Sequence, residues 1–240
     1  MEYFYVPNLN AKKGEVVIAG QEARHIAKVL RHKPGDEILG TNGRGDEFKM
    51  VIKNIQPERV LVNVFEKREG QREPQHKLTL APAVLKGNKL SLVVEAVTEL
   101  GVSEIAPFLS ARVVGKMGAV KGQRLRAVAI SGMKSALRTI LPEIKPVVGI
   151  EGLIKKFSDF DQVVVAYEEE RSKSLEQVLD TKVKSVLLII GPEGGFTKEE
   201  AGWMREAGAV LFTLGPRRLR AETAAVAATA LCLSLLGDLK

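Results

Sequence analysis

Hydrophobic and polar residues alternate in two different ways along the chain, and the change divides the sequence into two parts. Over roughly the first 66 residues, short apolar runs are separated by polar turns such as Lys33-Pro34-Gly35-Asp36. Apolar residues at helical spacing predict a helix over 21–30, with Ile26, Val29 and Leu30 on one face. The predicted strands are 3–6, 15–18, 37–41, 47–55 and 59–65. This combination is typical of a small β-barrel.

From Leu78 onward, predicted strands alternate with predicted helices. The strands are 78–84, 104–109, 144–148, 162–166, 183–190 and 209–214, and the longest helices are 90–100, 125–137 and 224–236. This alternation is typical of a mostly parallel sheet covered by helices. The charged, polar segment 67–77 indicates a linker. The sequence therefore predicts two domains, over residues 1–68 and 77–240.

Two of the predicted strands run into loops rich in glycine and proline. Val186–Phe196 reads Val-Leu-Leu-Ile-Ile-Gly-Pro-Glu-Gly-Gly-Phe, and Leu211–Ala224 breaks at Gly215 and Pro216. Glycine lets the backbone turn sharply and lets a ligand approach its N–H and C=O groups. Because open α/β sheets bind ligands at the carboxyl ends of their strands, we expect the two loops to lie side by side and form the site. Thr197 and Glu200 have the spacing of a capping box and predict the helix that follows.

Composition and charge narrow the choice of partner. The net charge of +7 and the pI of about 9.4 favour a polyanion, and nucleic acid is favoured over membrane because no basic amphipathic helix stands out. The single cysteine, Cys232, excludes a disulfide framework and favours a reducing compartment. No metal-ligand spacing is present. No signal-peptide pattern opens the sequence, and the apolar run 224–236 is too short to span a bilayer, so we expect a cytoplasmic protein.

The chemistry of the ligand follows by elimination. Gly191–Phe196 has neither the lysine of a phosphate-binding loop nor the Gly-x-Gly-x-x-Gly spacing of a dinucleotide site. Glu193 and the apolar approach suit a neutral or cationic ligand that carries hydroxyls. S-adenosylmethionine, with a sulfonium and a ribose, fits this description. The residues alone lead no further.

At these loops the sequence resembles the ribosomal RNA small subunit methyltransferase E family of the SPOUT superfamily. The likeness rests on Gly191-Pro192-Glu193-Gly194-Gly195-Phe196 followed by Leu214-Gly215-x-x-x-Leu219-Arg220-x-Glu222-Thr223-Ala224. Further matches are His25-x-x-x-Val29-Leu30-Arg31, Gly35-Asp36, Lys86-Gly87-Asn88-Lys89, Glu99-Leu100-Gly101-Val102, and Arg138 with Pro142-Glu143-Ile144. Ala96, Ala111 and Ser135 depart from the family pattern, and none of them lies in the two loops.

The resemblance implies a fold and a reaction. The fold is α/β, with an N-terminal PUA-like β-barrel that binds RNA and a C-terminal SPOUT domain whose mostly parallel sheet carries a trefoil-knotted chain. The reaction is methylation of N3 of one uridine in 16S ribosomal RNA of the small ribosomal subunit. S-adenosylmethionine is the implied cofactor, no metal is implied, and the enzyme is expected to be a homodimer.

The resemblance also implies which residues act. The cofactor contacts expected from the two loops are Gly191, Glu193, Gly194, Gly195, Leu214, Gly215, Leu219, Arg220, Thr223 and Ala224. The expected catalytic residues are Arg220, Glu222 and Arg138. A guanidinium can stabilise the negative charge that develops on the uridine oxygens, and a carboxylate, with Glu222 ahead of Glu193, can take the N3 proton. Contacts to RNA phosphates are expected from Arg24, Lys28, Arg31, Lys86, Arg112 and Lys116.

Simpler interpretations stand beside these. Glu193 can serve as a favourable charge at a helix N-terminus, Glu222 and Thr223 can support the start of the last helix, and Arg220 can form a surface ion pair. A solvated surface is the default for any single basic residue. Two other functions stay open: a ribosomal RNA-binding protein with a vestigial cofactor site, and a SPOUT enzyme that acts on another base or on transfer RNA.

Overall fold

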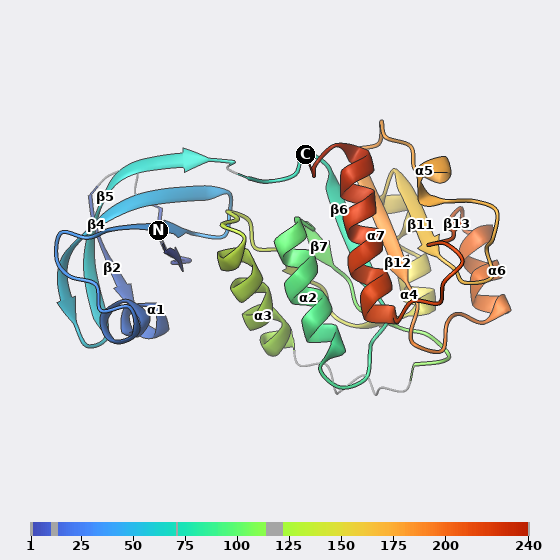
Figure 1. Ribbon diagram of the computed structural model, residues 1–240, viewed down its shortest axis with the longest axis horizontal. Helices are drawn as coiled ribbons and strands as arrows, with labels where there is room; N and C mark the ends of the chain where they lie inside the picture. The colour runs from blue at the N-terminus through green and yellow to red at the C-terminus, as the bar shows by residue number, and fades with distance from the viewer. Residues whose placement is uncertain (1, 11–13, 71, 114–121, 240) are drawn as a thin grey trace. The chain divides into compact units, whose positions relative to one another are not determined.

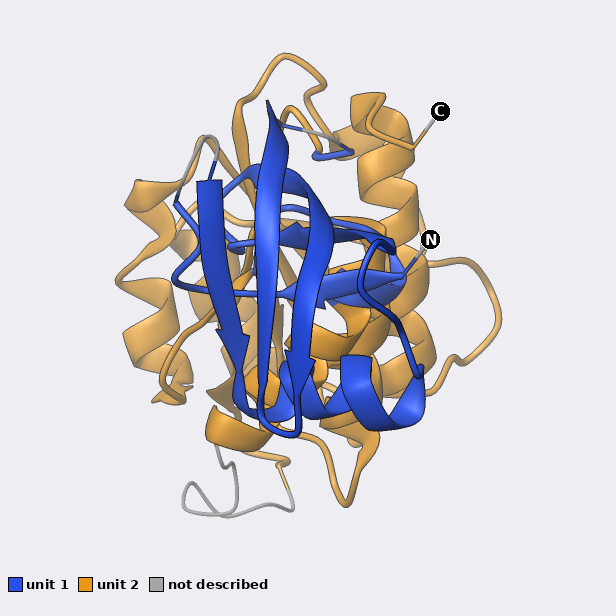
Figure 2. Cartoon of the chain, turned by 90° about the vertical axis from the view of Figure 1, so that its left-hand side faces the viewer, with its two compact units in different colours: residues 1–73, 133–141 blue, residues 74–132, 142–240 orange. Residues whose placement is uncertain are grey.

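A computed structural model describes residues 2–10, 14–70, 72–113 and 122–239 (Figure 1). The chain forms two compact units, coloured separately in Figure 2. Unit 1 contains residues 1–73 and 133–141, and unit 2 contains residues 74–132 and 142–240. The sequence pattern suggested one change of domain, near 68–77. The assignment of 133–141 to unit 1 depends on tertiary contacts that no local pattern encodes.

Unit 1 is built on a five-stranded mixed sheet of order β1-β3-β4-β5-β2, in which only the β1–β3 pair is parallel. Its strands are β1 (Tyr3–Tyr5), β2 (Gly14–Ala19), β3 (Glu37–Thr41), β4 (Asp46–Gln56) and β5 (Arg59–Glu69). Each of the five corresponds to a predicted strand. Every second side chain along β4 and β5 points inward, which buries Phe48, Met50, Ile52, Val60, Val62 and Val64. These residues form the centre of the unit's core.

The predicted helix over 21–30 consists of two pieces with different turns. An α-helix, α1 (Gly20–Arg24), passes directly into a π-helical turn, η1 (His25–Val29). Ile26 is fully buried, but Val29, predicted on the same face, is 67% exposed. The prediction for Val29 is wrong because the wider π turn shifts the positions that follow away from the spacing of 3.6 residues.

The buried carboxylate of Glu73 binds the segment 133–141 to the rest of unit 1. Glu73 Oε2 accepts hydrogen bonds from Arg138 Nη2 at 2.7 Å and from Arg138 Nε at 3.1 Å. Glu73 Oε1 accepts from the backbone N–H groups of Thr139 and Ile140, at 2.6 and 2.9 Å. Because both oxygens are occupied and both side chains are almost fully buried, this ion pair is part of the unit's framework.

Unit 2 is built on an all-parallel six-stranded sheet of order β13-β11-β12-β6-β7-β9. Its strands are β6 (Lys77–Pro82), β7 (Glu104–Ile105), β9 (Glu143–Ile144), β11 (Gln162–Ala166), β12 (Ser185–Ile190) and β13 (Val210–Phe212). The central strands β6, β11 and β12 are buried on both faces, as expected of a parallel sheet covered by helices. The predicted alternation of strands and helices is confirmed.

Two predicted strands, 104–109 and 144–148, are each divided by a proline. Pro107 separates β7 from β8 (Phe108–Leu109), and Pro146 separates β9 from β10 (Val148–Gly149). β8 and β10 leave the main sheet and pair with each other. Proline has no N–H to donate to a neighbouring strand, so the ladder of the main sheet ends there.

The helices of unit 2 are α2 (Lys89–Leu100), most of α3 (Gly122–Ser135), α4 (Ile150–Ile154), α5 (Leu175–Val178), α6 (Lys198–Glu206) and α7 (Ala221–Leu236), with a short 3-10 turn, η3 (Phe157–Asp159). Figure 1 shows α2 and α7 side by side, and α7 packs against β6 and β12. The predicted capping box at α6 is present, since Thr197 Oγ1 accepts from Glu200 N and Glu200 Oε2 accepts from Thr197 N.

Cys232 lies inside α7 and is fully buried. Burial raises the pKa of its thiol to about 12, so the residue serves as a small core side chain and carries no thiolate chemistry. Within the described residues, no helix is both long and apolar enough to cross a bilayer.

Candidate functional site

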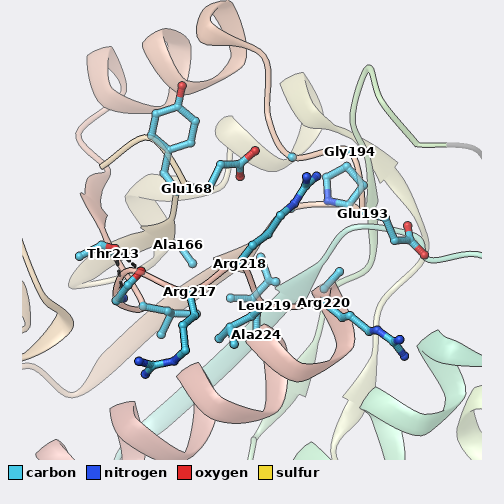
Figure 3. A pocket seen from close by; sticks show the side chains of 18 of the residues that line it. Ala166, Glu168, Glu193, Gly194, Thr213, Arg217, Arg218, Leu219, Arg220 and Ala224 are labelled. Carbon is cyan, nitrogen blue, oxygen red and sulfur yellow. Dashed lines mark hydrogen bonds between the residues drawn. The ribbon is translucent and has the colours of Figure 1, made fainter. Parts of the chain in front are cut away.

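The carboxyl ends of β11, β12 and β13 open into one pocket of about 690 Å³ in unit 2. The register places Ala166 at the end of β11 beside both Ile190 and Phe212, so the loops after the three strands emerge together. As predicted, the two glycine-bearing loops lie side by side at this edge. The lining is formed by residues 166–168, 190–195 and 213–221 together with Lys89, Arg112 and Ala224 (Figure 3).

The loop after β12 requires glycine for a measurable steric reason. Gly195 has a φ of +69°, and a Cβ placed on it would lie 1.7 Å from Glu168 Oε1. At Gly191, a Cβ would lie 2.9 Å from the ring of Phe196. The Gly195 N–H donates to the Pro192 carbonyl at 2.9 Å and closes the turn. Glycine here therefore lets the Glu168 carboxylate and the Phe196 ring lie directly against the backbone.

Arg112 holds the same loop from another direction. Its Nη1 donates to the Gly194 carbonyl at 2.9 Å and to the Phe196 carbonyl at 3.3 Å. A Cβ on Gly194 would come within 3.1 Å of the Arg112 Cβ. These hydrogen bonds from the Arg112 guanidinium stabilise the loop, and the residue also lines the pocket. The RNA contact expected of Arg112 stays a prediction.

The loop after β13 is anchored by its first residue. The Thr213 N–H donates to the Lys173 carbonyl at 2.8 Å, and the Gly215 N–H donates to Thr213 Oγ1 at 3.1 Å. At its other end, Arg220 is the N-cap residue of α7, and its carbonyl accepts from the Ala224 N–H at 2.8 Å. In the view of Figure 3, Thr213 lies at one end of the pocket, and Glu193 and Arg220 lie at the other.

An ionic cluster occupies the end of the pocket near Glu193. Lys89 Nζ lies 3.2 Å from Glu193 Oε1 and 3.4 Å from Glu222 Oε2. Burial disfavours the charged form of Glu193, but backbone hydrogen bonds and the Lys89 ammonium outweigh it and hold the pKa of this carboxyl below its usual value. The hydrogen bond to Glu193, helped by Glu222, raises the pKa of Lys89. Both shifts favour the charged forms of Glu193 and Lys89.

The structure gathers most of the residues that the sequence assigned to the cofactor. The lining includes Gly191, Glu193, Gly194, Gly195, Leu214, Gly215, Leu219, Arg220 and Ala224. Thr223 is exposed on α7 and does not line the pocket. Glu222 reaches the pocket through its contact with Lys89. Arg138 belongs to unit 1, where its guanidinium is bound to Glu73.

The residues assigned to RNA are placed as follows. Arg24, Lys28 and Arg31 are exposed on α1, η1 and the turn after them, and Arg24 forms an ion pair with Glu58. Lys86 is exposed just before α2. Lys116 lies outside the described residues.

A third loop, 166–168 after β11, belongs to the pocket and was missed from the sequence. The strand itself was predicted, but no glycine or proline marks its end, so the loop carried no signal. The parallel pairing of β11 between β12 and β13 would have been needed to find it. Thr213, Arg217 and Arg218 also line the pocket without having been singled out.

The pocket presents three kinds of surface to a ligand. Ile190, Leu214 and Leu219 supply apolar area, the glycine loops supply bare backbone, and charged side chains supply both signs. The carboxylates are Glu168 and Glu193, and the cations are Lys89, Arg112, Arg217, Arg218 and Arg220. A ligand with a flat apolar part, hydroxyl groups and an end bearing charges of both signs fits this combination.

Family models match both parts of the chain. The RNA methyltransferase domain model matches residues 71–233, and the RNA methyltransferase PUA domain model matches residues 18–65. Among curated proteins, ribosomal RNA small subunit methyltransferase E of Bacillus subtilis is 33% identical over 217 residues, which cover 86% of this chain and 85% of that protein. The protein of the same name from Mycobacterium bovis is 28% identical over 94% of this chain and 88% of its own length.

Solved structures agree with these matches. A ribosomal RNA small subunit methyltransferase E from Neisseria gonorrhoeae, bound to S-adenosyl methionine, superposes with a TM-score of 0.92 at 26% identity, covering all of both chains. A Legionella pneumophila methyltransferase in complex with the cofactor SAM superposes with a TM-score of 0.88 at 27% identity, covering 97% of this chain and 96% of that one. The likeness therefore extends over both units.

Proposed function

The chain belongs to the ribosomal RNA small subunit methyltransferase E family, and from this membership we propose that it transfers the methyl group of S-adenosylmethionine to N3 of a uridine in 16S ribosomal RNA. The family match covers both units, so the chain has the parts of an RNA methyltransferase of this type. The observation that carries the proposal is the pocket at the carboxyl ends of β11, β12 and β13.

The lining of this pocket fits the cofactor. Leu214, Leu219 and Ala224 offer apolar area suited to the adenine, and the bare backbone of Gly194 and Gly195 can come close to the ribose. Both signs of charge are present for the ammonium, the sulfonium and the carboxylate of the methionine part. When bound, S-adenosylmethionine supplies a methyl group activated by the positive sulfur.

The acceptor chemistry is assigned to α7 and its N-cap. The N3–H proton passes to Glu222, the N3 lone pair forms the new bond to the methyl carbon, and the electrons of the broken C–S bond stay on sulfur. Arg220 stabilises the negative charge on the uridine oxygens. The Lys89 ammonium lies 3.4 Å from Glu222 Oε2 and holds this carboxylate beside the pocket. Arg138 has a structural place in this assignment rather than a catalytic one, because Glu73 binds its guanidinium.

Unit 1 is the part of the chain proposed to bind the RNA. It matches a PUA domain of RNA methyltransferases, and Arg24, Lys28 and Arg31 are exposed on it. In unit 2, Lys86 and Arg112 are proposed to add phosphate contacts. Replacing Arg31 by Glu should weaken RNA binding and reduce its salt dependence without altering affinity for S-adenosylmethionine. An unchanged slope of affinity against salt would remove Arg31 from the RNA contacts.

The proposed enzyme works as a homodimer in the cytoplasm, where ribosomal subunits are assembled. Leu92 on α2 and Leu231 on α7 are 52% and 47% exposed, and the two helices pack together in unit 2. Large apolar side chains on neighbouring helices support an interface with a second copy. Sedimentation of the intact chain and of a Leu92→Glu/Leu231→Glu variant tests this, because only the former should sediment as a dimer. The trefoil knot stays a prediction.

The decisive experiment incubates the protein with unmodified small subunits and S-adenosylmethionine and maps the methylated nucleotide. Methylation at N3 of a single uridine of 16S RNA is the expected result. Methylation of transfer RNA or of another atom would contradict the proposal. Calorimetry with S-adenosylmethionine separates it from an RNA-binding protein with a vestigial site, which should give no heat.

A further inference from the structure

Lys89 connects three elements of unit 2 that are far apart in the sequence. It is the first residue of α2, Glu193 lies in the loop after β12, and Glu222 lies in the first turn of α7. The side chains are 32%, 31% and 20% exposed, so the cluster is shielded from water for the most part. A single ammonium thus joins the loop that forms the cofactor pocket to the helix that carries the proposed base.

The position of Lys89 is unfavourable for α2 taken alone. A cation at a helix N-terminus opposes the helix dipole, and α2 has neither an acidic residue in its first turn nor a side-chain cap. The compensating charge comes entirely from outside the helix, from Glu193 and Glu222. The stability of α2 alone therefore does not explain a lysine at position 89. The ion pairs of Lys89 with Glu193 and Glu222 do explain it.

Glu222 depends on Lys89 in turn. Its Oε2 is buried and accepts no hydrogen bond from the described part of the chain. The ammonium 3.4 Å away is the cation that faces it in an ion pair. Arg220 is a further charged residue close by, two positions before Glu222 at the start of α7, and the backbone N–H of Lys86 donates to Glu193 Oε1 at 3.4 Å. Arg112 also lines the same pocket.

We propose that Lys89 is a positioning residue of the methyl transfer: its one ammonium binds both Glu193 and Glu222 and limits the negative charge beside the methyl donor. This inference rests on the proposed function. With Lys89 the cluster has a charge of about −1, and without it about −2. Transfer neutralises the sulfonium, so excess negative charge stabilises the bound cation more than the transition state and slows the step.

Two measurements on Lys89→Met distinguish this role from a merely structural one. The first is the affinity for S-adenosylmethionine relative to the neutral product S-adenosylhomocysteine, measured by calorimetry. That ratio should rise about threefold to tenfold, because only the substrate carries the sulfonium charge that the extra carboxylate charge attracts. The second is the pH profile of single-turnover methylation on small subunits. Its acidic limb should move to higher pH, because a carboxyl that loses a nearby ammonium protonates at higher pH.

Three further variants complete the test. Lys89→Arg retains the charge and should restore the wild-type ratio and pH profile. Lys198→Met removes an exposed lysine from the same position, the first residue of α6, outside the pocket, and should leave both readouts unchanged. Lys89→Gln serves if Lys89→Met does not fold, as judged by thermal melting.

The outcomes are separable. A wild-type protein that binds no S-adenosylmethionine would remove the proposed function and this inference with it. A wild type that binds and methylates, together with a Lys89→Met variant that matches Lys198→Met in both readouts, would overturn the inference alone. Equal loss of affinity for substrate and product, with no movement of the acidic limb, would also overturn it.

Discussion

The two units each contain a shielded ionic cluster, and the two clusters are built differently. In unit 1, Arg138 and Glu73 are 3% and 7% exposed, and each Glu73 oxygen accepts at least two hydrogen bonds. In unit 2, Lys89 faces two carboxylates at longer distances, and Glu222 Oε2 accepts no hydrogen bond within the described residues. The first cluster is saturated, whereas the second retains capacity to bind a further partner.

This difference separates framework from site. In a saturated, buried ion pair every hydrogen-bonding position is occupied, so none is available to a ligand. Removing one partner leaves the charge of the other uncompensated in the interior. A cluster with an unsatisfied acceptor at the edge of a pocket can exchange contacts when a ligand enters. The family resemblance named both Arg138 and Glu222 as catalytic candidates, and the two residues have different surroundings.

The largest effect is expected from breaking the saturated cluster. Arg138→Met should lower the free energy of unfolding by about 3–5 kcal/mol, because it leaves the Glu73 carboxylate buried without its cation. Denaturant unfolding measures this. The control Arg24→Met breaks the exposed pair with Glu58 and should cost less than about 1 kcal/mol. Similar small losses in both variants would show that saturation and burial do not distinguish the Glu73 cluster.

In the open cluster, the change should appear in turnover instead. Glu222→Gln should reduce single-turnover methylation about 100-fold, because an amide cannot take the N3 proton. Affinity for S-adenosylmethionine, measured by calorimetry, should fall by no more than about tenfold, since Glu222 does not line the pocket and only one charge of the cluster is lost. Full turnover with bound substrates would end the assignment of Glu222 as the base.

A smaller effect is expected from disturbing the loop that presents Glu193. Gly195→Ala forces a Cβ against the Glu168 carboxylate at a positive φ and should weaken S-adenosylmethionine binding about tenfold, or about 1.4 kcal/mol. Gly202→Ala on α6 meets no atom within 4 Å and is the matched control. Its affinity should equal that of the wild type, and the helix should gain up to about 1 kcal/mol. Equal affinities for the two variants would contradict the steric account of Gly195.

The smallest effect concerns pH. Because the folded pKa of Glu193 lies below the ordinary value of 4.5, its ionisation stabilises the fold above that pH and the contribution is lost as the pH falls. Glu193→Gln should therefore lower the free energy of unfolding at pH 7 by less than about 1 kcal/mol, and the difference should shrink towards pH 3. Unfolding curves at both pH values measure it. A difference that grows on acidification would reverse the sign of the argument.

The sequence by itself determined the elements whose causes are local. Alternation of apolar and polar residues set the strands of unit 1, and apolar runs set β6, β11 and β12. The capping box at Thr197 and the glycine loops after β12 and β13 depend on neighbours a few residues away, so they could be found without a fold.

Tertiary structure decided what depends on residues far apart in the chain. Sheet order brought the unmarked loop 166–168 into the pocket, and contacts with Glu73 assigned 133–141, with Arg138, to unit 1. The charge cluster of Lys89, Glu193 and Glu222 exists only because α2, the loop after β12 and α7 meet. Electrostatic and steric interactions act through space, so a pattern along the chain could nominate these residues but could not give them partners.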